Sequence, residues 1–230
     1  MKKNFILLIA LLPFLVFAQN AEYDSLRHIK FGVGLLYTAD WSHQAKPIDY
    51  LVSGFEGPYG LTQSGAFGQQ IGVSFDVKFN EKWSLISGLI WNNRRFHEKI
   101  TSSPGTGTYA KTHTIGIDYL SIPFGVQYTI KKSDRIKLLA ELGIIYDKNM
   151  NDELTDSYAN LILKPRGWSI FGAFGAAYDI NKKSILEIKP IFRFAMSKYG
   201  ESSNSGVNNP PADFKPYSLG LAINYKILIN

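Results

Sequence analysis

The sequence has no cysteine, and this absence excludes several kinds of chemistry at once. The chain can form no disulfide, no thiolate metal site, no cysteine nucleophile and no cysteine-linked lipid anchor. No pair of histidines has metal-ligand spacing, and no glycine-rich loop carries the lysine of a phosphate site. We therefore expect no metal ion and no cofactor.

Long apolar runs are also missing, except at the N-terminus. Lys2 and Lys3 precede a run of about a dozen apolar residues, which is too short to cross a bilayer as a helix. Basic residues followed by such a run, with Ala18 before Gln19 as a cleavage site, are typical of a secretory signal. The expected divisions are a signal peptide over residues 1–18, a short periplasmic segment over residues 19–30, and one barrel domain over residues 31–230.

The charge balance is only mildly basic. The chain has 25 Lys and Arg against 19 Asp and Glu, a net charge of +6. Without Lys2 and Lys3 the balance is 23 against 19, or +4. The basic residues are too few and too scattered to indicate a nucleic-acid partner. The chain has 20 glycines and a high aromatic content, with 13 tyrosines and 15 phenylalanines, a composition that favours strands and turns over helices.

Apolar and polar residues alternate along much of the chain. In residues 67–79, one parity carries Phe67, Ile71, Phe75 and Phe79, and the other carries small or polar residues. Successive side chains of a strand point to opposite faces, so this alternation predicts a strand with one apolar face. A soluble sheet would need a covering layer, and no segment offers a suitable helix.

Eight segments show this pattern. Two of them contain a proline, Pro123 and Pro190, which cannot donate to a strand ladder and predicts a local irregularity. Ile86 and Ile90 fall on the polar parity, which predicts either a bulge or an apolar patch on the inner face. The segments are residues 31–41, 67–79, 83–99, 114–130, 136–146, 168–180, 186–196 and 217–229.

The connections between these segments are alternately short and long. Residues 80–82, 131–134 and 181–183 are short and polar, whereas residues 42–66, 100–113, 150–165 and 200–213 are long. Outer-membrane barrels have short periplasmic turns, long external loops and an even strand number. In hydrocarbon, strands persist only in a sheet without edges. We therefore predict an all-β protein, an eight-stranded antiparallel up-and-down transmembrane β-barrel of the outer membrane, with a lumen filled by side chains.

Charged residues on the inward parity are the candidate site. An isolated ion in a narrow lumen is costly, so these residues should pair with one another. We predict a structural network in which Glu141, Glu187 and Arg193 interact; a path for protons, ions or a solute is the alternative. The candidate lumen residues are Asp76, Lys78, Lys137, Glu141, Glu187, Lys189 and Arg193.

The four tryptophans are candidates for the aromatic girdles at the two membrane interfaces. Trp83 follows a short turn and Trp41 precedes a long connection, as expected for rings at opposite boundaries. Ligand stacking is the alternative role. The set is Trp41, Trp83, Trp91 and Trp168.

The stretch Tyr119–Tyr128, with sequence YLSIPFGVQY, resembles the PorT-like outer-membrane β-barrel family of Bacteroidetes, in which a Y-L-x-I-P strand followed by an aromatic residue recurs. The resemblance implies an eight-stranded outer-membrane barrel of the porin-like, OmpA-like kind. The named member of that family is associated with a protein-secretion apparatus. No functional residue is carried over, because the matching stretch is a structural strand.

These observations predict a non-enzymatic outer-membrane protein that acts in anchoring, in envelope integrity or in contact with a protein partner through its external loops. Outer-membrane lipid is the other expected partner. A narrow channel or carrier for small solutes is the first alternative, and a lipid-modifying enzyme is the second. The histidines are scattered and have no carboxylate at a telling spacing, so we predict no catalytic residue. A soluble periplasmic β-sandwich is the structural rival.

Overall fold

The computed structural model describes residues 29–44, 49–54, 57–102, 109–133, 135–151, 161–202 and 213–229, which contain strands and turns and no helix. None of these residues forms an apolar helix of membrane-crossing length. The strands are β1 (Lys30–Gln44), β2 (Asp49–Gly54), β3 (Gly57–Lys78), β4 (Trp83–Ser102), β5 (Tyr109–Lys132), β6 (Ile136–Asn149), β7 (Leu161–Leu163), β8 (Arg166–Asp179), β9 (Ser184–Ala195), β10 (Gly200–Ser202), β11 (Asp213–Phe214) and β12 (Pro216–Ile229).

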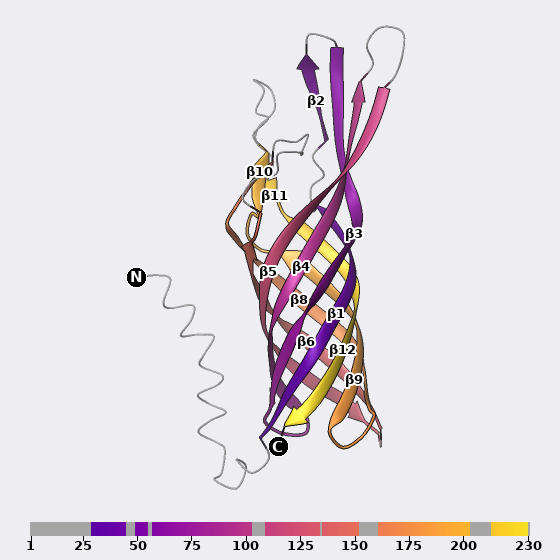
Figure 1. The fold of residues 1–230 in the computed structure, drawn as a ribbon, viewed down its shortest axis with the longest axis vertical. Coiled ribbons are helices and arrows are strands. Elements are labelled where there is room, and N and C mark those ends of the chain that lie inside the picture. The colour runs from indigo at the N-terminus through magenta and orange to yellow at the C-terminus, as the bar shows by residue number, and fades with distance from the viewer. Residues whose placement is uncertain are drawn as a thin grey trace, which may run out of the picture.

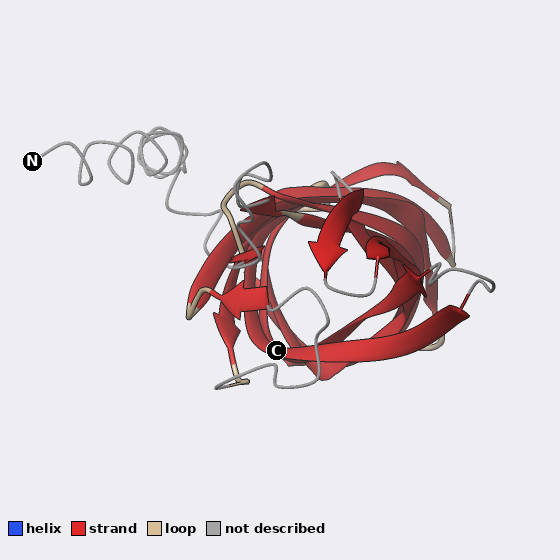
Figure 2. Ribbon diagram, turned by 90° about the horizontal axis from the view of Figure 1, so that it is seen from above, coloured by secondary structure: helices blue, strands red, loops and turns tan. Residues whose placement is uncertain are grey.

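Eight strands of the described chain close into a ring. Hydrogen bonding runs in the order β1-β12-β9-β8-β6-β5-β4-β3, and β3 pairs with β1 again. Every pairing is antiparallel. Apart from the short strands, neighbours in the ring are neighbours in sequence, except that the first strand, β1, pairs with the last strand, β12. Figure 1 shows the tilted strands from the side, and Figure 2 shows the ring along its axis. The predicted eight-stranded antiparallel barrel is confirmed.

Tight turns gather at one end of the barrel, where β1 begins and β12 ends (Figure 1). Two of the turns are stabilised in the same way by an asparagine side chain. The Asn80 side-chain oxygen accepts hydrogen bonds from the backbone of Lys82 and Trp83, both at 2.8 Å. The Asn181 oxygen does the same for Lys183 and Ser184, at 2.8 and 2.9 Å. Asparagine favours such turns because its side chain replaces a backbone acceptor.

The opposite end differs from the expectation of long irregular loops. Strands β3, β4 and β5 have 22, 20 and 24 residues, whereas the other strands of the ring have 12 to 15. Above the ring, residues 57–65, 96–102 and 109–118 continue the sheet and β2 pairs along their edge. We call these residues with β2 the projecting sheet, which rises beyond the barrel in Figure 1.

A second, smaller sheet lies at the same end. It has three antiparallel strands in the order β11-β10-β7, contributed by two connections that the sequence presents as loops. The expected loops 42–66, 100–113, 150–165 and 200–213 are therefore partly strand. Their polar composition hides this, because strands in water need no continuous apolar face.

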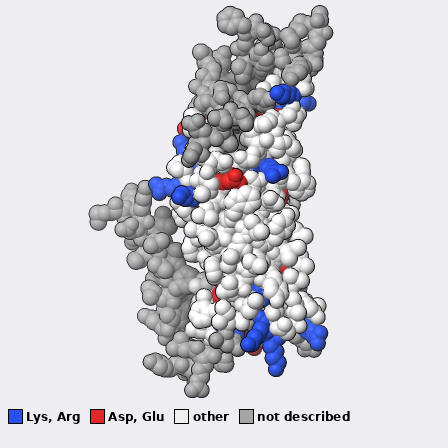
Figure 3. Space-filling model, in the orientation of Figure 1, with Lys and Arg blue, Asp and Glu red and all other residues white. Residues whose placement is uncertain are grey.

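The outward side chains of the ring are apolar. Leu35 and Leu142 are 68% and 65% exposed, and phenylalanines and isoleucines of the same parity surround them. Figure 3 shows a broad middle zone almost without charged groups, with lysines and arginines near both ends. Membrane-spanning barrels present this kind of surface to hydrocarbon.

The predicted irregularities take three forms. The ladder between β4 and β5 is interrupted opposite Pro123, and that between β8 and β9 beside Pro190, without a change of register. Ile90 is buried inside the ring, so the apolar-patch alternative is correct for that position. Bulges occur elsewhere, between Gly65 and Gln69 in β3 and between Thr129 and Lys131 in β5. The first bulge reverses the inward parity of β3, so Gln63 and Gln70 both face the interior.

The expected signal peptide over residues 1–18 lies outside the described residues, as does most of the segment over residues 19–30. The strands of the ring lie between Lys30 and Ile229, and the division into signal peptide, periplasmic segment and barrel domain stays a prediction.

Candidate functional site

The lower half of the lumen, toward the tight turns, is crossed by a group of buried charges that we call the lower cluster. Lys189 Nζ lies 2.5 Å from Glu141 Oε1 and 2.7 Å from Glu187 Oε2. Lys226 Nζ lies 2.8 Å from Glu187 Oε1 and 3.4 Å from Asp76 Oδ1. Because these groups come from β3, β6, β9 and β12, their ion pairs join walls that are distant in sequence.

Amides complete the lower cluster. Gln127 Nε2 donates to Glu141 Oε1 at 2.6 Å and to Glu187 Oε1 at 3.3 Å. Asn224 Nδ2 donates to Glu187 Oε2 at 3.4 Å, and Ser74 Oγ donates to Asn224 Oδ1 at 3.0 Å. Buried carboxylates are tolerated when most of their oxygens are paired in this way.

An apolar layer follows above the lower cluster. Ile90, Ile145 and Phe171 are buried there, and Pro123 contributes to the same layer. The space left among these side chains and the adjoining charged groups is only about 60 Å³. The described side chains therefore fill the middle of the lumen.

The upper half of the lumen contains a second polar group, the upper cluster, centred on Asp147. This carboxylate is fully buried and accepts hydrogen bonds from Arg94 at 3.0 Å and from the hydroxyls of Ser121 and Tyr199. The Arg94 guanidinium also lies 5.1 and 5.0 Å from the ring centres of Tyr119 and Tyr199. The paired charge and the two aromatic faces together compensate for the burial of Arg94.

Tyr199 connects the upper cluster to the small sheet. It follows β9, its backbone N–H donates to the Phe214 carbonyl, and its ring covers Gly167 so closely that a Cβ on Gly167 would lie within 3 Å of it. Above it, Phe96, Ile117 and Phe214 form a buried apolar cap. Next to the cap, outside the membrane-spanning strands, a 2.6 Å hydrogen bond to Asp213 raises the pKa of the exposed Lys198 ammonium.

The stretch that carries the family resemblance lies on the lumen wall. Alternate residues of it face inward and contact successive layers of the filling. Tyr119 and Ser121 belong to the upper cluster, Pro123 to the apolar layer and Gln127 to the lower cluster. Gly125 faces the Phe171 ring, where a Cβ would clash. In this chain the stretch is thus a row of lumen contacts.

The structure brings some of the predicted lumen residues together and separates others. Asp76, Glu141, Glu187 and Lys189 meet in the lower cluster. Lys137 pairs instead with Asp179 at 2.5 Å, and Lys78 lines the space below the cluster.

The predicted contact of Arg193 with Glu141 and Glu187 is not seen. Arg193 interacts electrostatically with Asp147, Arg94 and Asp40 instead. When the Asn92 amide is oriented with its oxygen toward the two arginines, that oxygen accepts a hydrogen bond from Arg193 Nη1 at 2.9 Å. The reason is that Arg193 and the two glutamates lie at different heights along the barrel axis. Arg193 is four residues beyond Lys189 on β9, which places it on the far side of the apolar layer.

The sequence prediction omitted Lys226, Arg94, Asp147 and Tyr199. The first three carry a usable signal, because each is a charged residue on the inward parity of its strand. Tyr199 carries none, since it lies outside a regular strand and enters the lumen through a turn.

All four tryptophans lie on the outward face. Trp41, Trp83, Trp91 and Trp168 are each about two-fifths exposed. Trp83 begins β4 beside a tight turn, and Trp168 is near the start of β8 at the opposite end. Their role as interface girdles stays a prediction.

An antiparallel ring with an apolar exterior and a filled, ion-paired interior defines the class of membrane-spanning β-barrels. The family described as outer membrane protein beta-barrel domain matches residues 17–197, which is most of the chain. The protein therefore belongs to that outer-membrane family. No curated protein matches the chain.

Several solved structures are similar to this chain at low sequence identity. Outer membrane protein AlkL has a TM-score of 0.50 and 9% identity, with 87% of this chain and 90% of that chain covered. OprG of Pseudomonas aeruginosa has a TM-score of 0.49 and 15% identity, with 88% and 96% covered. The outer membrane protease OmpT of Escherichia coli has a TM-score of 0.39 and 10% identity, with 87% and 96% covered. At these identities the likeness concerns the fold alone.

Proposed function

We propose that this outer-membrane barrel is a non-enzymatic scaffold that carries the projecting sheet for contact with a protein partner outside the cell. The single observation that supports this most is the length of β3, β4 and β5, which continue as a paired sheet well beyond the ring. A barrel needs only about 9 to 11 residues per strand to cross a membrane, so the additional length has another use.

The described side chains of the projecting sheet suit an aqueous surface. Thr62, Ser64, Lys99 and Thr112 are exposed, and His97 is bonded to Thr114 at 2.8 Å. On the other face, Gln63 donates to the buried Glu98 at 2.7 Å. One face of the projecting sheet is thus polar and exposed to water, and its other face is stabilised by hydrogen bonds and by the apolar cap. The sheet therefore offers a defined surface to a partner.

The orientation in this proposal follows from the turns. Tight turns mark the periplasmic end of outer-membrane barrels. The projecting sheet would therefore lie outside the cell, and the start of β1 and the end of β12 would lie on the periplasmic side. We also propose that residues 1–18 direct export and are removed, that the apolar exterior contacts outer-membrane lipid, and that the protein is PorT-like and accessory to protein secretion. The likeness of Tyr119–Tyr128 to the strand pattern of that family supports the PorT-like assignment, on which the role in secretion depends.

The absence of cysteine allows a clean test of orientation and contact. Lys99→Cys and Lys111→Cys place single thiols on the projecting sheet, and Lys82→Cys and Lys183→Cys place them at the tight turns. A membrane-impermeant maleimide should label the first pair on intact cells and the second pair only after lysis. The reverse pattern would contradict the proposal.

The same positions then report on a partner. A photo-crosslinker attached at Lys99→Cys or Lys111→Cys should yield one adduct of defined mass on intact cells, and the tight-turn positions should not yield it. Purified partner should then bind the barrel and lose affinity when Lys99 and Thr112 are both changed to glutamate. If neither position on the projecting sheet gives a position-specific adduct, the contact function is wrong.

A narrow channel is the second candidate, and the charged lumen favours it. Planar-bilayer recording separates the two proposals. A scaffold with the lower cluster in place should show no stable unitary conductance, whereas regular single-channel steps would favour the channel.

A further inference from the structure

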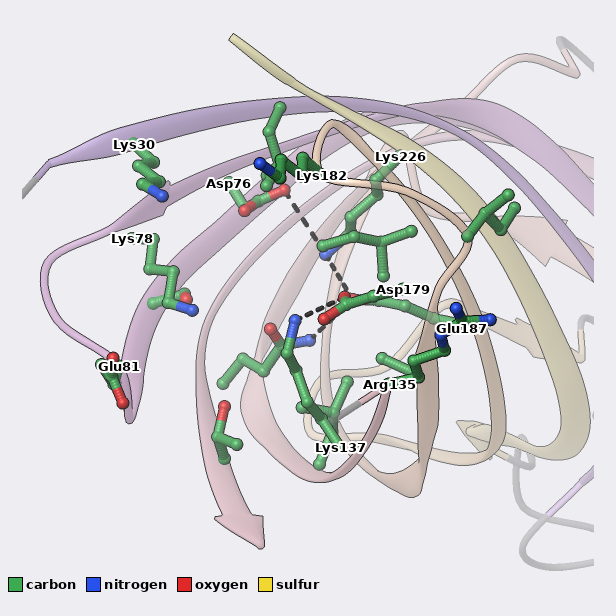
Figure 4. Close-up of a pocket in the computed structure, with 18 of the residues that line it drawn as sticks. Lys30, Asp76, Lys78, Glu81, Arg135, Lys137, Asp179, Lys182, Glu187 and Lys226 are labelled. Carbon is green, nitrogen blue, oxygen red and sulfur yellow. Dashed lines mark hydrogen bonds and ion pairs between the residues drawn. The ribbon is translucent and has the colours of Figure 1, made fainter. Parts of the chain in front are cut away.

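The tight-turn end of the lumen opens into a cavity of about 700 Å³, below the lower cluster. Figure 4 shows charged side chains of several strands pointing into it, with Lys226 joined to Asp76 and Glu187 at its inner end. We call this space the vestibule. Its volume lies within the roughly 300 to 1,000 Å³ of ordinary ligand sites. The proposed contact function does not use it.

The inner end of the vestibule has more carboxylates than ammonium groups. Asp76 is 7% exposed, and its Oδ1 accepts no hydrogen bond from the described residues, although Lys226 Nζ lies 3.4 Å away. Lys226 is closer to Glu187, at 2.8 Å. The lower cluster as a whole has three carboxylates, Asp76, Glu141 and Glu187, against two ammonium groups. A buried acceptor of this kind is costly unless a donor reaches it.

The mouth of the vestibule has the opposite balance. The described residues around it include the cations Lys30, Lys78, Arg135 and Lys182 and the carboxylate Glu81. Lys30, Arg135 and Lys182 are exposed, so they can turn toward a ligand at little cost. The side walls are neutral. Lys137 is paired with Asp179 there, and Leu139, Ala177 and Leu228 supply apolar surface.

We infer that the vestibule is a binding site for a small zwitterion that carries a free ammonium group and a carboxylate, in the size range of a short peptide. The ammonium group pairs with the Asp76 carboxylate at the inner end, where carboxylates outnumber ammonium groups. The carboxylate lies at the mouth among Lys30, Arg135 and Lys182. Aliphatic parts between the two ends contact the apolar walls. Charge-assisted hydrogen bonds at both ends favour the zwitterion over a simple anion or cation. In the orientation given above, the site opens toward the periplasm.

The probe is an alanine tripeptide with free termini, titrated into the full-length barrel in detergent micelles and followed by calorimetry. Two matched probes are the N-acetylated tripeptide and the tripeptide amide. Saturable binding of the free peptide is expected, with at least tenfold weaker binding of each blocked peptide. Equal binding of the N-acetylated form would leave a site for anions only, and equal binding of the amide would leave a site for cations only. Either result, or no saturable binding of the free peptide, would overturn the inference.

Three variants locate the bound peptide. Asp76→Asn should weaken the free peptide at least tenfold and leave the N-acetylated form unaffected. Since Asp76 is also an ion-pair partner, the double variant Lys30→Gln with Lys182→Gln serves as the second test, because both side chains are exposed and their loss should not disturb folding. That variant should weaken the free peptide and leave the amide unaffected. Lys198→Gln, at the opposite end of the barrel, is the control. Unchanged affinity in the double variant would exclude the mouth as the carboxylate site.

Discussion

Replacing Lys189 by methionine tests whether the ion pairs of the lower cluster hold the barrel together. Lys189 is 5% exposed and its ammonium group bridges Glu141 and Glu187 at 2.5 and 2.7 Å. Methionine has similar length and no charge, so it leaves two buried carboxylates with one less cation. Breaking a buried pair in this way costs about 3 to 5 kcal/mol. Gln127 and Lys226 still contact the two carboxylates, so we expect the lower end, about 3 kcal/mol.

The measurement is the free energy of unfolding in urea, with the barrel folded into phospholipid vesicles and followed by tryptophan fluorescence. The double variant Lys189→Met with Glu141→Gln should recover much of the loss, because it removes one of the uncompensated carboxylates. The coupling between the two changes should be about 0.5 to 3 kcal/mol, the range found for residues in contact. Lys198→Met is the matched control, since Lys198 is an exposed partner of Asp213, and its loss should have no measurable effect.

Two results would refute the reasoning. If Lys189→Met unfolds at the same urea concentration as Lys198→Met, the lower cluster does not contribute to stability. If the two changes in the lower cluster are additive, Lys189 and Glu141 do not interact in the folded barrel.

Three further changes test the exterior, the upper cluster and the turns. Leu142 lies midway along β6 and is 65% exposed, so Leu142→Arg should lower the free energy of unfolding by about 2 to 4 kcal/mol. Met196 lies beyond the end of β9, and Met196→Arg should lower it by only about 0 to 1 kcal/mol. Equal losses would mean that the apolar exterior does not face hydrocarbon. Tyr199→Phe removes one hydrogen-bond donor from the buried Asp147, so it should lower the free energy of unfolding in urea by about 1 to 3 kcal/mol. The same variant should speed proteolysis of the connection after β9, and an unchanged cleavage rate would contradict this. Asn181→Ala removes the acceptor of two backbone N–H groups in the turn between β8 and β9, and a lower refolding yield into vesicles, restored by Asn181→Asp, is the expected result.

The architecture could be predicted because its main signal is local. Alternation at every second residue depends only on the geometry of a single strand, so Leu35 and Phe75 could be assigned to the outer face without knowing their neighbours. The tight turns are equally local, since Asn80 and Asn181 form their hydrogen bonds within three residues. The projecting sheet was missed because its exposed residues are polar, and because three glycines and one proline in residues 54–60 suggest a loop.

The interior could be predicted by parity but not by partner. Parity correctly places Asp76, Glu187 and Arg193 inside the ring. Which of them meet depends on the register of every strand pair, on two bulges and on how far the strands shift around the closed ring. These are long-range properties, and a displacement of four residues along β9 was enough to move Arg193 from the lower to the upper cluster.

The sequence by itself therefore determined the class of fold, the apolar exterior, the polar interior and the ends of the strands at the tight turns, because each depends on neighbouring residues within one strand or turn. Only the tertiary structure decided the two clusters, the apolar layer between them, the entry of Tyr199 into the lumen and the charge arrangement of the vestibule. Each of these needs side chains from strands far apart in the chain to lie at the same height, and that height is fixed when β1 pairs with β12 and β3 to close the ring.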